Sequence, residues 1–382
     1  MSYGFTSKCL YGDDTDDEGG CDCSGAVVFP VYQSATFTHP ELGRSTGYDY
    51  SRAQNPTRDH LEKIVSTLED GAGAIAMASG MAAISAVMEL FHAGDHIITD
   101  IDLYGGSIRL FDEIGVKNGL TFSHIDCSQD DAEAYMTEQT KAVYIESPTN
   151  PMMHIVDIRK MAEIAHRHNL LLIVDNTFLS PYFQKPLLLG ADLVIHSATK
   201  YLAGHNDTLA GIVVASTKEL NDKLHMIAMT TGGILSPFDS FLVTRGIQTL
   251  PIRMEKAQEN ARALVKWLEN CKSVTRVFYP GRKESKGYEI TVRQTSGFGA
   301  MISFEVDRKE RVSEILNKVR LIHFAESLGG VETLITYPIR QTHASVPQEI
   351  LDRTGLTDRI LRLSVGIEDI QDLLNEFERI FA

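Results

Sequence analysis

The chain has 382 residues, of which 43% are hydrophobic and 23% are charged, and these fractions are ordinary for a globular protein. The length predicts two or three domains. A formal net charge of −15 argues against nucleic acid and anionic membranes as partners, because both require a basic surface. The sequence shows neither a run of about 18 apolar residues nor a secretory signal, so we expect a cytoplasmic protein.

The cysteines and the acidic N-terminal run indicate neither a disulfide bond nor a metal site. The five cysteines are an odd number without paired spacing, which favours reduced thiols over a disulfide framework or a zinc site. The run DDTDDE at residues 13–18, followed by Cys21 and Cys23, lacks the ligand order of a calcium loop. We therefore predict no metal and interpret the run as a solvated arm.

Short apolar runs alternate with amphipathic stretches between residues 71 and 216, which predicts strands and helices in succession. The expected strands cover residues 74–78, 96–99, 121–125, 142–146, 170–174, 193–196 and 211–215. The expected helices cover residues 81–91, 107–117 and 158–168, where apolar residues recur at three- and four-residue spacing. This alternation is typical of an α/β domain with a mostly parallel sheet covered by helices.

The pattern changes after residue 245. A long amphipathic stretch at 253–270 precedes strand-like segments at 274–279 and 300–304, and a helical segment at 369–381 closes the chain. This mixture predicts a smaller α+β domain that packs on the first. We place the larger domain at 51–245 and the smaller one at 246–382.

Polar residues follow three of the expected strands, at the edge where open α/β sheets bind ligands. Ser79, Gly80 and Met81 open a helix, and such a start can bind a phosphate, although Ser79 is also a good N-cap. Asp175 follows the fifth strand, where a buried carboxylate needs a cation, donors or a turn to cap. The sixth strand is followed by Ser197-Ala-Thr199-Lys200.

Together these strand ends offer hydroxyl and backbone donors for a phosphate, a carboxylate for a protonated ring nitrogen and an amine for an aldehyde. Pyridoxal 5'-phosphate (PLP) requires these three things. A nicotinamide dehydrogenase is disfavoured, because the glycine pattern at residues 71–76 precedes its strand instead of following it. A binding protein that retained the fold without catalysis is also disfavoured, because Lys200 and Asp175 are both present.

The motifs identify a family resemblance that covers nearly the whole chain from about residue 25. The chain resembles the Cys/Met-metabolism (trans-sulfuration) family of PLP-dependent enzymes, which includes cystathionine γ-synthases, cystathionine γ- and β-lyases and methionine γ-lyases. The matching motifs are DYSRAQNPT at 49–57, SGM at 79–81, YGGS at 104–107, ESPTN at 146–150, VDNTF at 174–178, SATK at 197–200, AESLGG at 325–330 and RLSVG at 362–366. The resemblance implies PLP fold type I, which is aspartate aminotransferase-like, with a seven-stranded sheet in the large domain.

The resemblance also implies roles for the cofactor-site residues. Lys200 would bond the cofactor aldehyde and act as the catalytic base, Asp175 would pair with the pyridinium, and Tyr104 would stack on the ring and act near the leaving group. The phosphate would be held by Ser79, Gly80, Met81, Ser197 and Thr199. Residues 1–50 would form an N-terminal arm that contacts a neighbouring subunit, and Tyr50 and Arg52 would complete the phosphate site of that subunit. A homo-oligomer, as a dimer of dimers, would follow.

The substrate residues implied by the resemblance are Arg362, Asn150, Ser327 and Glu326. Arg362 would bind the substrate carboxylate with its planar fork, assisted by Asn150 and Ser327. Glu326 is typical of family members that handle cystathionine, whose distal amino group it can meet. Methionine γ-lyase is disfavoured by Glu326 and by Gly106, where those enzymes typically carry a cysteine.

Synthase and lyase remain two alternatives within one mechanism. The motifs at 49–52, 104–107, 298–301 and 327–332 are most similar to bacterial γ-synthases, whereas those at 180–183 and 342–345 also recur in γ-lyases. We favour a γ-synthase that joins an O-acylhomoserine to cysteine. A cystathionine γ-lyase, or a broader cystathionine, cysteine or homocysteine lyase, is the alternative.

Overall fold

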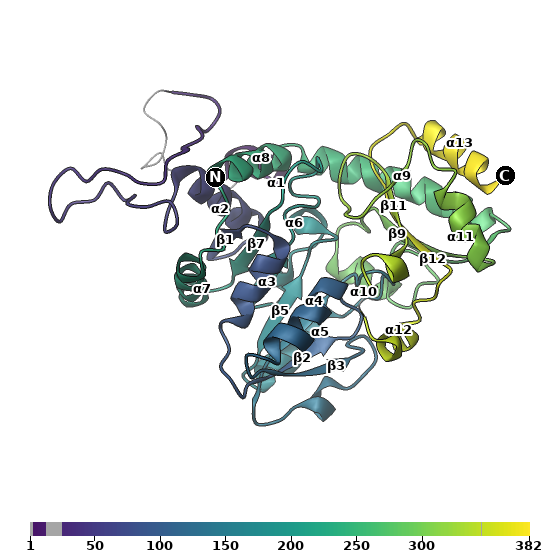
Figure 1. Cartoon of the computed structure of the whole chain (residues 1–382), viewed down its shortest axis with the longest axis horizontal. Coiled ribbons are helices and arrows are strands. Elements are labelled where there is room, and N and C mark those ends of the chain that lie inside the picture. Colours follow the sequence, from purple (N-terminus) through teal and green to yellow (C-terminus); the bar gives the residue numbers. More distant parts are fainter. Residues whose placement is uncertain (1–2, 13–24, 345) are drawn as a thin grey trace.

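Two β-sheets organise the chain, and both lie in one elongated body from which a segment near the N-terminus projects (Figure 1). The structure is a computed structural model that describes residues 3–12, 25–344 and 346–382. The acidic run at 13–18 and the cysteines at 21 and 23 lie outside the described residues. In the part of the chain that is described, no helix is long and apolar enough to cross a membrane.

The larger sheet has seven strands in the order β1-β7-β6-β5-β4-β2-β3. Neighbouring strands are parallel from β3 to β6, and β7 runs antiparallel to both β1 and β6. The strands are β1 (Gly73–Met77), β2 (His96–Asp100), β3 (Thr121–Ile125), β4 (Thr140–Glu146), β5 (Leu171–Asp175), β6 (Leu193–His196) and β7 (Gly211–Ala215). All seven expected strands are confirmed, with ends that differ by at most two residues.

Helices cover both faces of this sheet, which explains why its central strands, such as β5, β6 and β7, are rich in apolar residues. Val194 packs in the cluster on the face of α2 (Pro56–Glu69) and α5 (Ile158–Arg167), whereas its neighbour Ile195 packs in the cluster on the face of α3 (Gly80–Met88) and α4 (Gly105–Arg109). The helices of this half are α1 (Phe5–Tyr11), α2 (Pro56–Glu69), α3 (Gly80–Met88), α4 (Gly105–Arg109), α5 (Ile158–Arg167), α6 (Ser180–Phe183), α7 (Lys218–Thr231) and α8 (Pro237–Ile247).

The helix expected at residues 107–117 is divided in the structure. It consists of α4 and a π-helical turn at Leu110–Gly115. A Cβ at Gly115 would lie 2.7 Å from the ring of Phe122, so the glycine lets this turn approach β3 closely. The helix expected at 81–91 ends at Met88, and the one expected at 158–168 is confirmed as α5.

The C-terminal part forms a second sheet of five strands in the order β10-β11-β12-β9-β8. Its strands are β8 (Val274–Phe278), β9 (Met301–Val306), β10 (His323–Phe324), β11 (Leu334–Thr336) and β12 (Ile360–Ser364). Its helices are α9 (Leu250–Asn270), α10 (Tyr288–Gln294), α11 (Lys309–Leu316), α12 (Gln348–Thr354) and α13 (Ile370–Phe381). The predicted smaller α+β domain is therefore present, and its long first helix spans the top of the view in Figure 1.

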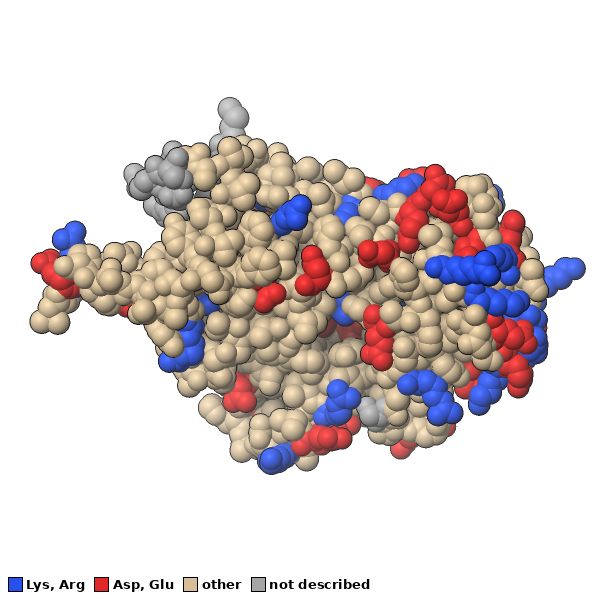
Figure 2. Space-filling view, turned by 45° about the horizontal axis from the view of Figure 1, so that its top comes forward, with Lys and Arg blue, Asp and Glu red and all other residues tan. Residues whose placement is uncertain are grey.

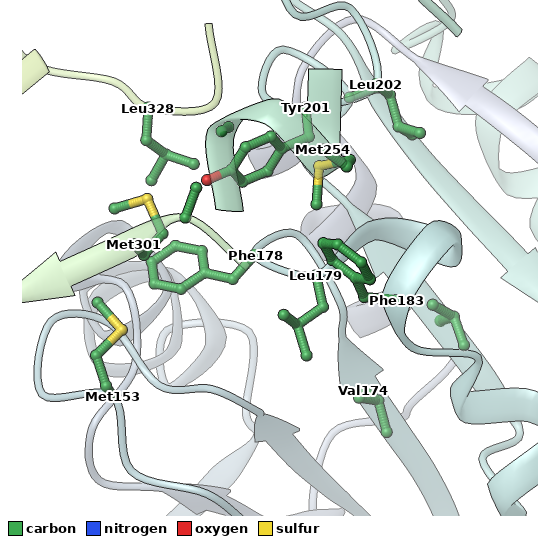
Figure 3. Packing of buried hydrophobic residues seen from close by; sticks show 14 of the residues in the cluster. Met153, Val174, Phe178, Leu179, Phe183, Tyr201, Leu202, Met254, Met301 and Leu328 are labelled. Carbon is green, nitrogen blue, oxygen red and sulfur yellow. The ribbon is translucent and has the colours of Figure 1, made fainter. Parts of the chain in front are cut away.

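A continuous hydrophobic core joins the two sheets and lies directly behind the predicted site. Figure 3 shows Phe178, Tyr201, Leu328 and Met301 converging on one another. All four are at least 95% buried. Tyr201 follows Lys200 and Leu328 follows Ser327 in the chain. The core therefore restrains the backbone on both sides of the site.

The segment from residue 25 to 50 projects from the body and buries little of itself (Figure 1). The side chains of Val27 and Leu42 are fully exposed, and Tyr50 is 49% exposed. In contrast, α1 packs on α2 of the same chain, with Cys9 fully buried. In Figure 2, charged side chains crowd the end of the molecule that carries the C-terminal sheet, whereas the surface toward the projecting segment is mostly uncharged.

Candidate functional site

Two glycines, Gly80 and Gly211, allow the residues that follow β1 to pack closely against the residues that follow β6. A Cβ at Gly80 would lie 2.9 Å from Ser197 Cβ, and a Cβ at Gly211 would lie 2.0 Å from the carbonyl oxygen of Ser79. Larger residues at either position would push α3 away from the turn that follows β6. The glycines therefore assemble Ser79, Gly80 and Ser197 into one cradle.

The cradle keeps backbone donors available for an anion. Ser79 is the N-cap of α3, and its hydroxyl accepts the N–H of Ala82 at 3.1 Å. The N–H groups of Gly80 and Met81 donate to no group within the described residues and lie at the positive end of the helix dipole. The Thr199 hydroxyl donates to the carbonyl oxygen of Ala210 at 3.1 Å and accepts its N–H at 2.9 Å. Ser79 can therefore cap the helix while the N–H groups of Gly80 and Met81 stay available to bind a phosphate.

Asp175 is the last residue of β5 and is buried. Its carboxylate accepts the N–H of Thr177 at 3.0 Å. Burial raises the pKa of Asp175, while hydrogen bonds from Thr177 and the charge of His196 oppose that rise. Among the described residues, no lysine or arginine forms an ion pair with Asp175. A protonated ring nitrogen would supply the missing cation.

Lys200 lies in the turn after β6, and its Nζ donates to the hydroxyl of Ser327 at 2.7 Å. Burial, and then the positive charge of Arg362, lower the pKa of Lys200 to about 8, with Glu326 opposing the change. A lysine with this pKa is partly neutral near physiological pH, as a nucleophile and proton acceptor must be.

Arg362 lies in β12 and is almost fully buried. Its two terminal nitrogens donate to Asn150 Oδ1 at 2.8 Å, to the Ser327 carbonyl oxygen at 3.0 Å and to Thr336 Oγ1 at 3.3 Å, while its Nε has no hydrogen-bond partner in the described chain. Burial lowers the pKa of Arg362 to about 10. An arginine held in this way is oriented to receive a carboxylate.

Ser327 connects the lysine to the arginine and has an unusual backbone. Its φ is +88°, a left-handed conformation that residues other than glycine rarely adopt. The conformation accompanies a hydroxyl bonded to Lys200 and a carbonyl bonded to Arg362. Such strain concentrates at functional sites, where the surrounding structure compensates for it.

Tyr104 precedes α4, and its side chain is 38% exposed. A Cβ at Gly106 would lie 2.4 Å from Cε1 of Tyr104, and one at Gly105 would lie 2.2 Å from the carbonyl oxygen of Thr342. The backbone N–H of Tyr104 donates to Glu146 Oε2 at 3.1 Å. Gly106 therefore provides the space that the ring of Tyr104 occupies.

The remaining predicted residues lie at the edges of this arrangement. Glu326 lines a cavity of about 880 Å³ together with Thr199 and Ser327. Tyr50 and Arg52 lie at the base of the projecting segment, where the guanidinium sits 5.6 Å from the tyrosine ring and donates to the Met229 carbonyl oxygen at 2.5 Å. No hydrogen bond or ion pair joins either residue to Lys200 within the described chain.

Sequence reasoning missed three buried groups that support the site: Glu146, Tyr144 and His343. His343 Nε2 donates to the carbonyl oxygens of Asn150 at 3.1 Å and Leu103 at 3.2 Å. Burial, reinforced by Arg362, lowers the pKa of His343 to about 4. The ESPTN and THAS motifs contain Glu146 and His343, but only the folded chain shows which backbone groups they contact.

The residues present fit PLP better than a metal. No group of three or more His, Cys, Asp or Glu side chains that could hold a metal ion occurs in the described residues. The open N–H groups of α3, the buried carboxylate without a cationic partner and the amine with a lowered pKa match the phosphate, ring nitrogen and aldehyde of PLP.

Comparisons with known proteins agree with this geometry. A family model described as Cys/Met metabolism PLP-dependent enzyme matches residues 12–382. Cystathionine gamma-lyase of Bacillus subtilis is 48% identical over 368 residues, which is 96% of each chain. The cystathionine gamma-synthase/O-acetylhomoserine (thiol)-lyase of the same organism is 46% identical over 359 residues, which is 94% of this chain and 92% of the relative.

Solved structures show the same similarity. Cystathionine gamma-lyase from Lactobacillus plantarum, complexed with L-serine, has a TM-score of 0.95 and 42% identity, covering 99% of this chain and 98% of the other. Cystathionine gamma synthase from Xanthomonas oryzae pv. oryzae, in complex with aminoacrylate and cysteine, has a TM-score of 0.95 and 39% identity, covering 100% and 98%. The expected fold is thereby confirmed, and the chain belongs to the Cys/Met-metabolism family of PLP-dependent enzymes.

Proposed function

We propose that this enzyme works at the γ-carbon of amino acids and that its main reaction is γ-replacement, in which the sulfur of cysteine bonds the γ-carbon of an O-acylhomoserine and the acyloxy group leaves as a carboxylate, to give cystathionine. The observation that carries the proposal is the continuous chain of contacts from Lys200 through Ser327 to Arg362. It connects a proton acceptor directly to the group that would orient the substrate carboxylate. Glu326, on the wall of the adjoining cavity, suits the distal ammonium of cystathionine.

The proposed roles of the residues follow from their environments. When bound, PLP supplies an aldehyde for the substrate amine and a ring that withdraws electrons from the substrate carbons. Arg362 would hold the substrate carboxylate with its fork, and Asn150 would keep that fork in plane through its 2.8 Å bond. Lys200 Nζ would remove the Cα proton, become neutral again by passing that proton to the cofactor, and then remove a Cβ proton. The γ-substituent could then leave with the electron pair of its bond to the γ-carbon.

Two further groups would act around Lys200. The Ser327 hydroxyl would orient the amine, which is already within hydrogen-bonding distance. Tyr104, partly exposed in front of the strand ends, would lie against the cofactor ring and place its hydroxyl near the leaving group. Asp175 would pair with the ring nitrogen and keep it protonated.

A cystathionine γ-lyase is the second candidate, because the relative with 48% identity has that name. The same residues would perform the early proton transfers. The two reactions differ at the end, since a lyase releases an α-keto acid instead of accepting cysteine.

A product assay distinguishes the two candidates. The purified enzyme is incubated either with O-acetyl- or O-succinylhomoserine plus cysteine, or with cystathionine alone. Formation of cystathionine in the first reaction supports the synthase. Efficient release of 2-oxobutyrate or pyruvate from cystathionine, without any replacement product, would refute it. Borohydride should trap the cofactor on wild-type protein but not on the Lys200→Ala variant, and a colourless wild type with no trapped adduct would refute both candidates.

We also propose that the enzyme works as a homo-oligomer, with dimers that pair into a tetramer. The support is the projecting segment at residues 25–50, whose apolar side chains at Val27 and Leu42 are fully exposed in the single chain. In this arrangement Tyr50 and Arg52 would complete the phosphate site of a second copy.

A further inference from the structure

Glu146 is a buried acid with no role in the proposed reaction. It is the last residue of β4, and it pairs across the sheet with Asp175 at the end of β5. Only 5% of its surface is exposed, and its Oε2 accepts the backbone N–H of Tyr104 at 3.1 Å. The end of β4 therefore touches Tyr104, the residue proposed to stack on the cofactor. The end of the neighbouring β5 carries Asp175, the residue proposed to pair with the ring nitrogen.

The surroundings of Glu146 disfavour its negative charge. Asp175, Asp102 and Asp100 are the acidic groups that face it, and Arg362 is the cationic group nearby. Burial, and then the charge of Asp175, raise the pKa of Glu146 well above its ordinary value. A carboxyl group that carries its proton can still accept a hydrogen bond through its carbonyl oxygen. Glu146 is thus suited to act as a neutral acceptor.

Three local features determine where the backbone and ring of Tyr104 lie. Glu146 bonds its N–H, Gly106 leaves space for its ring, and Gly105 lies directly against the carbonyl oxygen of Thr342. Of these contacts, the bond to Glu146 is the one made by a side chain of the sheet. It ties the position of the ring to the strands that carry the rest of the site.

We propose that Glu146 is a positioning residue, whose carboxyl group holds the backbone of Tyr104 and so sets the ring of Tyr104 over the cofactor site. The inference rests on the proposed function, since it concerns the same site. It requires an acceptor atom at residue 146 and does not require a charge there. A glutamine should therefore replace the glutamate, and an alanine should not.

The test compares Glu146→Gln and Glu146→Ala with wild type. Glu376→Ala is the matched control, because Glu376 is a buried carboxylate in α13 that also accepts backbone N–H groups, those of Arg320 at 2.6 Å and Leu321 at 3.1 Å. The readouts are the dissociation constant of PLP from the apoprotein, the visible circular dichroism of the bound cofactor, and kcat and KM separately.

Loss of one buried acceptor should weaken PLP binding and lower kcat by about tenfold in Glu146→Ala, and should reduce the dichroism signal. Glu146→Gln should stay within about threefold of wild type. Glu376→Ala should lower the unfolding temperature without changing PLP affinity. In a Tyr104→Ala background, Glu146→Ala should cause no further loss of PLP affinity, because its effect is transmitted through that ring.

Three results would overturn the inference: PLP affinity and kcat in Glu146→Ala equal to wild type, a loss in Glu146→Gln as large as that in Glu146→Ala, or additive losses with Tyr104→Ala. Each of these outcomes leaves the proposed function intact, because wild type still binds PLP and turns over substrate. Failure of the proposed function gives a different result, namely wild-type protein that neither binds PLP nor forms product.

Discussion

Lys200 Nζ donates a hydrogen bond to the hydroxyl of Ser327 at 2.7 Å, although 127 residues separate the two in sequence. The bond crosses from the turn after β6 to the loop after β10, and so it joins the two sheets at the site. Because Ser327 also binds Arg362 through its carbonyl oxygen at 3.0 Å, a change at Ser327 should affect both the lysine and the arginine of the site.

Ser327→Ala removes the hydroxyl and leaves the Lys200 amine without this partner. We expect kcat/KM to fall by about tenfold, the usual effect of one lost hydrogen bond near a charged group. Steady-state kinetics with O-acetylhomoserine and cysteine measure the loss. Ser327→Gly is the companion variant: it should lose the same activity yet unfold at a higher temperature than Ser327→Ala, because glycine adopts the φ of +88° without strain. Wild-type kinetics in both variants would contradict the role assigned to the hydroxyl.

Arg362→Lys keeps a positive charge but loses the planar fork. We expect kcat/KM to fall by about a hundredfold, mainly through KM, because an ammonium cannot make two parallel bonds to a carboxylate while also reaching Asn150. Arg359→Lys is the control, since Arg359 lies just before β12 and pairs with Glu305 at 2.6 Å on a more exposed edge. It should change kcat/KM by less than about twofold. Equal losses in the two variants would indicate damage to β12 instead of lost substrate binding.

Lys200 should make the stability of the apoprotein depend on pH. Its pKa is lowered from 10.5 to about 8, so between these values the unfolded chain binds more protons at this residue than the folded chain. The free energy of unfolding should therefore rise with pH across the window from 8 to 10.5. Denaturant unfolding of the apoprotein against Lys200→Met isolates the contribution, which is about 3 kcal/mol. Parallel pH profiles for the two proteins would show that the pKa of Lys200 is not lowered.

Gly106→Ala should displace the ring of Tyr104, since the added Cβ would lie 2.4 Å from Cε1. We expect weaker PLP binding and a loss of kcat of about tenfold or more. Gly4→Ala is a suitable control, because nothing lies within 4 Å of a Cβ at that position. Normal PLP affinity in Gly106→Ala would show that the ring moves aside at no cost.

The projecting segment should carry part of the subunit interface. Replacing Val27 and Leu42 together with aspartate should shift the protein toward smaller species in sedimentation velocity, because the charges would be buried against a second copy. Val292→Asp introduces a charge at a half-exposed apolar residue of α10 and should leave the oligomer unchanged. An unaltered sedimentation profile in the double variant would place the interface elsewhere.

The sequence predicts some elements of this protein better than others. The central strands of the large sheet are recognisable because both of their faces are buried, which makes each one a short apolar run between polar turns. Strand β12 is less evident, since Arg362 interrupts its apolar residues. The division of the helix at 107–117 depends on the contact of Gly115 with Phe122, which no local pattern reveals.

By itself, the sequence determined the cofactor chemistry, because PLP requires particular residue types at strand ends, and Lys200, Asp175 and the Ser79–Gly80–Met81 turn occur at those ends in recognisable order. Only the tertiary structure decided which groups control them. Glu146, His343 and the left-handed Ser327 act through hydrogen bonds to residues 42 to 240 positions away. Contacts over such distances arise from the strand order of the large sheet, which places β4 beside β2, and from the packing of the C-terminal part on that sheet, and neither has a local signature in the chain.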